Sequence, residues 1–328
     1  MEKDPKKMNW PAIGNDTAIE FLSRSLINEK IAQTYVFTGP DDLGKSTIAL
    51  AYAKNLQGEA AGFNSDLHIL EPLADKKSIS IEQVREFIKT LNLSSFSDSY
   101  KIGIIKQAEL LSEEAKSALL KTLEEPTEKT VIILLVSDEN NLPKTILSRA
   151  QVLYFYPVKA SIIYDYLIKE CGANRSLAKD LASLVLGRPL KALHLLENAD
   201  QYSAYLVRAE TIINFFKEDL NTRLSNLDKI YNDKSYSKQA VVSAQEVLEI
   251  SEGIMRDLLL LNLGETDLLQ HVMLKDKLME AKAAIELAYG DNSGAYILSK
   301  MSLISDARKY LNSNVNPRLV LEQFLINL

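Results

Sequence analysis

The feature that most constrains this chain is a glycine-rich segment between a short apolar run and a helical pattern. Residues Gly39–Ser46 read GPDDLGKS and match G-x-x-x-x-G-K-[ST], with the run YVFT directly before them. Glycines at such positions let backbone N–H groups turn inward around phosphate, and the start of the following helix adds a field that favours an anion. The segment therefore predicts a phosphate-binding loop in which Lys45 reaches the terminal phosphates and Ser46 ligates Mg²⁺. The loop residues expected to contact nucleotide are Gly39, Gly44, Lys45, Ser46 and Thr47.

Two acidic residues inside the loop oppose this prediction. Asp41 and Asp42 would lie beside a bound polyphosphate, and carboxylates repel it. A loop that keeps its shape without ligand is therefore the alternative interpretation. The motif allows ATP with Mg²⁺ as a ligand, whereas the charge of the loop disfavours it.

The first half of the chain alternates short β-branched runs with helical patterns, which is the rhythm of βαβ units around a parallel sheet. The expected strands are Tyr35–Thr38, Leu67–Leu70, Ile102–Ile105, Val131–Ser137 and Val152–Phe155. The expected helices are Ser46–Leu56, Ile81–Leu91 and Ser112–Leu123, the last of them ended by Pro126. These elements predict a five-stranded nucleotide-binding layout of the α/β class.

After Tyr156 and Pro157 the strand signal disappears, and the chain continues as amphipathic helices broken at glycines. A shift near residues 197–202 is the expected boundary within this helical half, and the polar stretch 232–235 is an expected loop. We therefore expect three domains: an α/β nucleotide-binding domain at residues 1–157, a small helical lid at 158–202 and an all-α domain at 203–328.

Composition excludes several classes of protein. The net charge of −6 argues against a broad basic surface for nucleic acid, and apolar runs such as Val131–Val136 are too short to span a bilayer. A single cysteine, Cys171, excludes an internal disulfide and a multi-cysteine metal site. The three histidines, His68, His194 and His271, are far apart in the sequence, and we expect them to be structural. We expect a cytoplasmic protein that binds neither zinc nor a membrane.

A hydrolytic P-loop protein needs a second apolar strand that ends in an acidic residue for Mg²⁺, next to a carboxylate that orients the attacking water. The strand Ile102–Ile105 is present, yet Lys106 and Gln107 stand where the two acids would be expected. A cation there repels Mg²⁺, so ATP hydrolysis by this chain should be very slow. Glu109 is a nearby acid, but it lies beyond the strand end and is expected to start the following helix.

Residues 101–126, KIGIIKQAELLSEEAKSALLKTLEEP, resemble the clamp-loader branch of AAA+ proteins, and the run ALLKTLEEP is highly specific to it. Residues 142–151, LPKTILSRAQ, resemble the L-P-T-I-x-S-R-C-Q segment of that family, with Ala150 in place of the cysteine. Two tail segments, 256–261 and 314–322, resemble the helical collar of bacterial delta-prime and related subunits. The resemblance covers nearly the whole chain.

This resemblance implies an AAA+ domain, a lid and a collar that takes part in a clamp loader of the DNA polymerase III holoenzyme. The implied partners are the other loader subunits, the sliding clamp and, through the complex, primed DNA. Arg149 matches the arginine that such subunits present to a neighbour's ATP, where a planar guanidinium can bind two phosphate oxygens. Lys191 lies where relatives place a lid residue that senses nucleotide. A solvated side chain is the alternative at both positions.

In the family that this sequence resembles, a subunit that lacks both acidic residues but retains the Ser-Arg pair is a non-hydrolysing stator. The resemblance therefore implies this role. One departure is that relatives commonly insert a four-cysteine zinc module after the first helix, whereas residues 55–66 contain no cysteine.

Two other functions stay open. The first is an active ATPase motor subunit of the loader, which Lys106 and Gln107 disfavour. The second is an interaction module of another replication or repair complex, which the collar-like tail disfavours. No carboxylate constellation for nucleotidyl transfer is evident, so polymerase activity would reside in other subunits.

Overall fold

The computed structural model of the chain describes residues 8, 10, 11, 13–58, 66–73, 76, 78–92, 100–125, 127, 129–231, 237–313 and 315–328. Pro126 and the polar stretch 232–235, both singled out in the sequence, lie outside the described residues. The chain divides into two compact units. The first is Met1–Tyr166 with Gly187–Lys191, and the second is Leu167–Leu186 with Ala192–Leu328.

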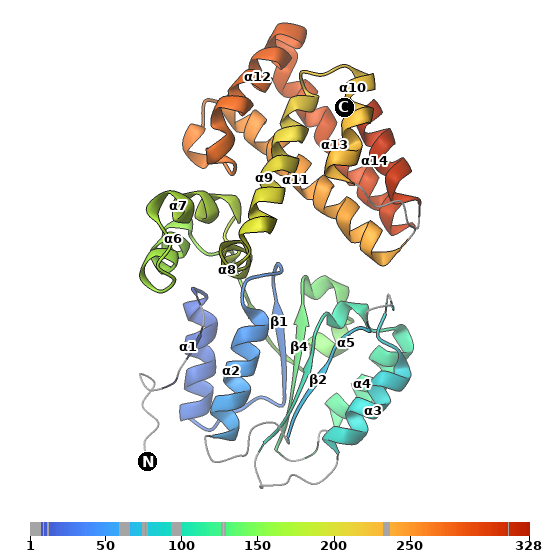
Figure 1. Ribbon diagram of the computed structural model, residues 1–328. Helices are drawn as coiled ribbons and strands as arrows, with labels where there is room; N and C mark the ends of the chain where they lie inside the picture. Colours follow the sequence, from blue (N-terminus) through green and yellow to red (C-terminus); the bar gives the residue numbers. More distant parts are fainter. Residues whose placement is uncertain are drawn as a thin grey trace. The chain divides into compact units, whose positions relative to one another are not determined.

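The first unit is built on a five-stranded parallel sheet with the strand order β2-β3-β4-β1-β5 (Figure 1). The strands are β1 (Thr34–Thr38), β2 (Leu67–Leu70), β3 (Lys101–Ile105), β4 (Thr130–Val136) and β5 (Gln151–Tyr154). β1, β3 and β4 are buried along their whole length, as parallel strands with both faces covered should be. All five expected strands are confirmed, each to within one residue at either end.

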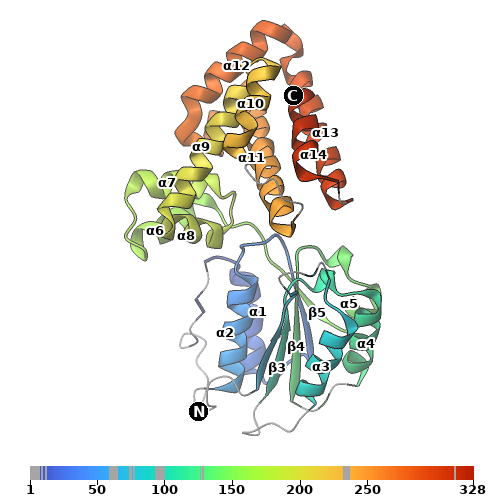
Figure 2. The same cartoon turned by 45° about the vertical axis from the view of Figure 1, so that its right-hand side comes forward.

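Helices cover both faces of this sheet (Figure 2). They are α1 (Asp16–Ile27), α2 (Lys45–Gln57), α3 (Ile81–Leu91), α4 (Glu113–Glu124) and α5 (Lys144–Leu147), with the one-turn helices η2 (Ala108–Leu110) and η3 (Glu139–Asn141). Tyr35 and Phe37 of β1 pack with α1 and α2, whereas Val36 between them packs with α3 and α4 on the opposite face. This alternation follows from the two-residue period of a strand. The three expected helices are confirmed, and α1 and α5 are additional.

In its described residues the second unit is helical. Its elements are the end of α6 (Ala160–Lys169), α7 (Arg175–Leu184), most of α8 (Pro189–Glu197), α9 (Ala199–Phe215), α10 (Leu220–Ile230), α11 (Lys238–Asn262), α12 (Lys275–Tyr289), α13 (Ser293–Asn312), α14 (Pro317–Ile326) and the one-turn helices η4 (Thr266–Leu268), η5 (Val272–Leu274) and η6 (Gly290–Asn292). α11 contacts α9, α12, α13 and α14 and is the central helix of the bundle. The expected boundary at 202/203 lies within α9, and the three-domain division stays a prediction. None of the helices described is long and apolar enough to cross a membrane.

A buried polar cluster joins three parts of the second unit. The carboxylate of Asp257, on α11, accepts hydrogen bonds of 2.8 Å from the backbone N–H groups of Gln270 and His271, and lies 2.8 Å from His271 Nδ1. The other ring nitrogen of His271 lies 2.8 Å from the hydroxyl of Tyr205 on α9. The side-chain amide of Gln270 donates to the carbonyl of Leu184 at the end of α7, at 2.9 Å. These contacts link α7, α9 and α11.

Candidate nucleotide-binding site

The loop Gly39–Ser46 connects the end of β1 to the first turn of α2, at the carboxyl edge of the sheet. Gly39 has a φ of 143°, and a Cβ at this position would lie 2.3 Å from the carbonyl oxygen of Phe155. Gly44 has a φ of 88° and directly precedes α2. Gly39 is required because two backbone segments approach closely, and Gly44 because its φ is positive. The strand, loop and helix that the motif needs are therefore all present.

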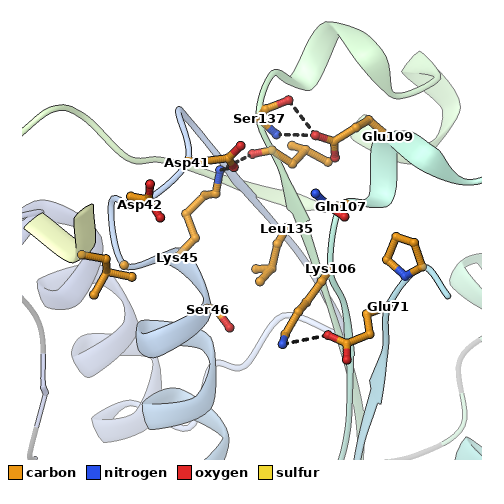
Figure 3. Close-up of a pocket in the computed structure, with 14 residues that line it drawn as sticks. Asp41, Asp42, Lys45, Ser46, Glu71, Lys106, Gln107, Glu109, Leu135 and Ser137 are labelled. Atoms are coloured by element: carbon orange, nitrogen blue, oxygen red, sulfur yellow. Dashed lines mark hydrogen bonds and ion pairs between the residues drawn. The ribbon is translucent and has the colours of Figure 1, made fainter. Parts of the chain in front are cut away.

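The ammonium group of Lys45 is bound by backbone carbonyls (Figure 3). Nζ donates to the carbonyl of Val136 at 2.8 Å, to that of Pro40 at 3.1 Å and to that of Gly39, and it lies 3.5 Å from the Asp41 carboxylate. Burial lowers the pKa of Lys45 below its ordinary value, although the charge of Asp41 opposes this effect. A lysine has three N–H donors, so the carbonyls alone are enough to engage all of them.

A cavity of about 350 Å³ lies beside the loop, at the ends of β3 and β4. Of the residues predicted from the sequence, it brings together Gly44, Lys45, Ser46, Lys106 and Gln107. Its lining also includes four carboxylates, which belong to Asp41, Asp42, Glu71 and Glu109. Only two ammonium groups, those of Lys45 and Lys106, balance them within the lining. An acidic lining disfavours a polyphosphate because like charges repel.

Four other predicted residues, Gly39, Thr47, Arg149 and Lys191, do not belong to the described lining of this cavity. Thr47 lies half-buried in the first turn of α2. Leu190, the residue before Lys191 on α8, does line the cavity. Its backbone N–H donates to the carbonyl of Asp42 at 3.1 Å. The start of α8 is therefore tied to the loop through Leu190.

The end of β3 carries a cation where a hydrolytic site carries an acid. Nζ of Lys106 lies 3.0 Å from a carboxylate oxygen of Glu71, which follows β2, as Figure 3 shows. Gln107 comes next, with a φ of 50°. The loop N–H groups suit phosphate oxygens, whereas the position of the acidic Mg²⁺ ligand holds an ammonium group. The backbone of the loop therefore suits a phosphate group, whereas its acidic surroundings oppose one and Lys106 opposes a metal at the end of β3.

Glu109 lies in this cavity, contrary to the expectation that it starts the following helix. It belongs to η2, a separate one-turn helix, and α4 begins only after its N-cap Ser112. The Glu109 carboxylate accepts hydrogen bonds from the backbone N–H of Ser137 at 3.1 Å and from its hydroxyl at 2.6 Å. Ser112 with the two acidic residues after it is typical of a helix N-terminus and agrees with the helix expected from Ser112, so Glu109 lies before that helix.

Arg149 follows α5 and contacts α4. Its Nη2 lies 2.9 Å from a carboxylate oxygen of Glu124, and its Nη1 donates to the carbonyl of Thr145 at 3.0 Å. The side chain is 37% exposed. An ion pair at this exposure contributes about 0–1 kcal/mol, so the guanidinium can exchange Glu124 for another anion at low cost.

The sequence predicts structural roles for Cys171 and the three histidines. Among the described residues, no three His, Cys, Asp or Glu side chains form a group that could hold a metal ion. Cys171 is exposed, and partial burial together with the charge of Glu170 raises the pKa of its thiol. Burial and the charge of Lys101 lower the pKa of His68, on β2. A thiol with a raised pKa is a poor nucleophile at neutral pH.

Comparisons with known proteins bear on this site. Residues 14–159 match the family model described as DNA polymerase III, delta subunit. The chain is 26% identical to the DNA polymerase III subunit delta' of Bacillus subtilis over an alignment 327 positions long, which covers 94% of each chain. It is also 26% identical to the Bacillus subtilis subunit tau over 72% of this chain and 45% of tau, and 28% identical to the Buchnera aphidicola subunit gamma over 57% of each.

Among solved structures, a DNA polymerase III gamma subunit-related protein from Thermotoga maritima matches with a TM-score of 0.51 at 18% identity, over 93% of this chain and 97% of that one. This likeness shows the fold, a parallel α/β sheet domain followed by a helical part, and confirms the expected fold class. The segments 101–126 and 142–151 both lie within the range matched by the family model. The chain is thus similar to the delta', tau and gamma subunits of DNA polymerase III, and the family match covers residues 14–159.

Proposed function

We propose that this chain is a non-hydrolysing stator subunit of a bacterial sliding-clamp loader within the DNA polymerase III holoenzyme. In this role it supports ATP-dependent loading of the clamp onto primed DNA in the cytoplasm. Its partners are the other loader subunits, the clamp and, through the complex, primed DNA. The α/β domain (1–157) carries the loop, the lid (158–202) follows it, and the helical collar (203–328) assembles with the neighbouring subunits.

The observation that carries this proposal is the ion pair of Lys106 with Glu71 at the end of β3, at 3.0 Å. Phosphoryl transfer depends on a metal that neutralises developing charge and on an oriented nucleophile. Lys106 occupies the position of the metal ligand, and Gln107 that of the water-orienting acid. A chain with Lys106 and Gln107 at these positions would not hydrolyse ATP itself and would instead support hydrolysis by a neighbouring subunit.

Arg149 is the residue through which this support would act. It is exposed at the end of α5, outside the described lining of the chain's own cavity, and its partner is a surface glutamate, Glu124. An arginine placed in this way is available to a nucleotide that another subunit binds. If the loop of this chain holds a nucleotide, the contacts would come from Gly39, Gly44, Lys45, Ser46, Thr47 and Lys191, and they would serve assembly rather than turnover.

The test is a phosphate-release assay on the isolated chain, with and without primed DNA, next to gel filtration with the other loader subunits. We expect hydrolysis at the background rate and co-elution in a complex. Turnover that Lys45→Ala abolishes would refute the non-hydrolysing role. A chain that does not co-elute with loader subunits would instead indicate an interaction module of another complex.

A second candidate function is that of an active ATPase subunit of the loader. The observation that favours it is the carboxylate of Glu109 in the lining of the cavity, where it would orient a water molecule. Both hydrogen bonds of one Glu109 oxygen go to Ser137, which holds the carboxylate at the end of β4. The same assay separates the candidates, because Glu109→Gln would abolish turnover in an active subunit.

A further inference from the structure

Glu109 and Lys45 converge on one strand end from opposite sides. Val136, the last residue of β4, binds the ammonium group of Lys45 through its carbonyl at 2.8 Å. The next residue, Ser137, donates both its backbone N–H and its hydroxyl to the carboxylate of Glu109. Figure 3 shows Lys45 and Glu109 on either side of this end of the strand. A cation and an anion of the same chain thus occupy the edge of the cavity.

One oxygen of the Glu109 carboxylate, Oε1, accepts both hydrogen bonds from Ser137. The other oxygen, Oε2, is buried and has no hydrogen-bond partner within the described part of the chain. Buried carboxylate oxygens normally have partners, because an unpaired one loses its hydration without compensation. Within the described residues, Glu109 is thus held at the cavity through one oxygen, by the two donors of Ser137.

Lys45 and Ser137 carry the donors that a terminal phosphate would use, and in this structure those donors are engaged by other groups. A phosphate at the end of the loop needs cationic charge and N–H or O–H donors directed at its oxygens. Here the donors of Lys45 go to carbonyls, and the two donors of Ser137 go to Glu109. A carboxylate is also an anion with acceptor oxygens, so Glu109 can take these contacts in place of a phosphate.

We propose that Glu109 is a specificity-determining residue that weakens the binding of nucleoside polyphosphates at the loop, by using the Ser137 donors and opposing the charge of the terminal phosphates. The proposal rests on the proposed non-hydrolysing function, since a carboxylate that blocks the terminal phosphate has no part in turnover. It predicts an effect that grows with the number of phosphates. The nucleoside end of the ligand is unaffected.

The experiment is a binding titration of the full chain with AMP, ADP and a non-hydrolysable ATP analogue. Glu109→Gln keeps the size of the side chain and an acceptor oxygen for Ser137, while it removes the negative charge. We expect this variant to bind the ATP analogue about tenfold more tightly than the wild type does. Its affinity for ADP should rise by a smaller factor, and its affinity for AMP should not change. Glu109→Ala, which removes the carboxylate altogether, should show the same order and serves if the first variant does not fold.

Glu113→Gln is the matched control, because it removes the same charge from an 81% exposed carboxylate on α4. It should leave all three affinities unchanged. An unchanged affinity for the ATP analogue in both Glu109 variants would overturn the proposal, and so would an equal gain for AMP or for the control. Hydrolysis is measured separately, so ATP turnover in the wild type would defeat the proposed function, whereas the affinities decide the role of Glu109.

Discussion

Nζ of Lys106 lies 3.0 Å from the carboxylate of Glu71, so that two opposite charges meet at the ends of the neighbouring strands β3 and β2. The two side chains are 36% and 61% exposed, and a pair at this exposure contributes about 0–1 kcal/mol to stability. The pair therefore adds little to stability. Under the proposed function, it puts an ammonium group where a hydrolytic site would need an acid for Mg²⁺.

This arrangement predicts that Mg²⁺ has little influence on nucleotide binding. The affinity of the wild-type chain for ADP should change by less than about twofold between Mg²⁺ and EDTA, because the ammonium group of Lys106 would repel the metal. Titration of a labelled ADP under both conditions measures this. In Lys106→Asp, with Glu71→Gln to avoid two facing carboxylates, Mg²⁺ should tighten binding. A strong Mg²⁺ dependence in the wild type would mean that a different acid holds the metal.

The exposed Arg149 predicts an effect on other subunits. Arg149→Ala should lower hydrolysis at the site that it serves in a reconstituted loader by about a thousandfold, because the charge of the transferring phosphoryl group loses its stabilising cation. Complex formation, followed by gel filtration, should survive. Glu124→Gln is the control, since it removes the partner of Arg149 and keeps the guanidinium. Unchanged DNA- and clamp-stimulated hydrolysis in an intact Arg149→Ala complex would return Arg149 to the role of a surface side chain.

The buried cluster of the helical bundle predicts a large loss of stability on truncation. Asp257→Ala should lower the free energy of unfolding by about 3–5 kcal/mol, because His271 and the backbone N–H of Gln270 lose a buried acceptor. Urea denaturation gives the value. Asp306→Ala, at a 56% exposed carboxylate paired with Lys309 on α13, should cost about 1 kcal/mol or less. Similar losses in the two variants would show that the cluster is not a stabilising centre.

The buried ammonium group of Lys45 predicts a dependence of stability on pH. Burial lowers the pKa of this group below 10.5 in the folded chain. Between the lowered value and 10.5 the unfolded chain binds more protons than the folded chain, so the contribution of Lys45 to stability rises with pH. The free energy of unfolding is measured for the wild type and for Lys45→Met across this pH window. The value for the wild type minus that for the variant should increase as pH rises. A difference that stays flat or falls with pH contradicts the prediction.

The sequence predicted elements whose signal is local. Strands such as Thr130–Val136 are continuous apolar runs between polar turns, and the loop Gly39–Ser46 carries its glycines at positions that need positive φ or close approach. α1 is absent from the sequence prediction although Asn15 and Asp16 are residues typical of a helix start, and the structure does not use Asn15 as a side-chain cap. Asn15, directly before it, has a φ of 58° and makes no side-chain cap. Instead its side-chain oxygen accepts a hydrogen bond from the backbone N–H of Tyr156, 141 residues away.

The sequence by itself determined which residues form the loop, which strand lacks its acids, and where the helical half begins, because side-chain period and turn chemistry are local properties. Only the tertiary structure decided that Glu71 faces Lys106, that Glu109 reaches Ser137, and that Val136 binds Lys45. Each of these pairs joins segments 28 to 91 residues apart. They meet because β2, β3, β4 and β1 lie side by side in that order, and the order of strands in a sheet follows from the packing of the whole domain rather than from any short stretch of sequence.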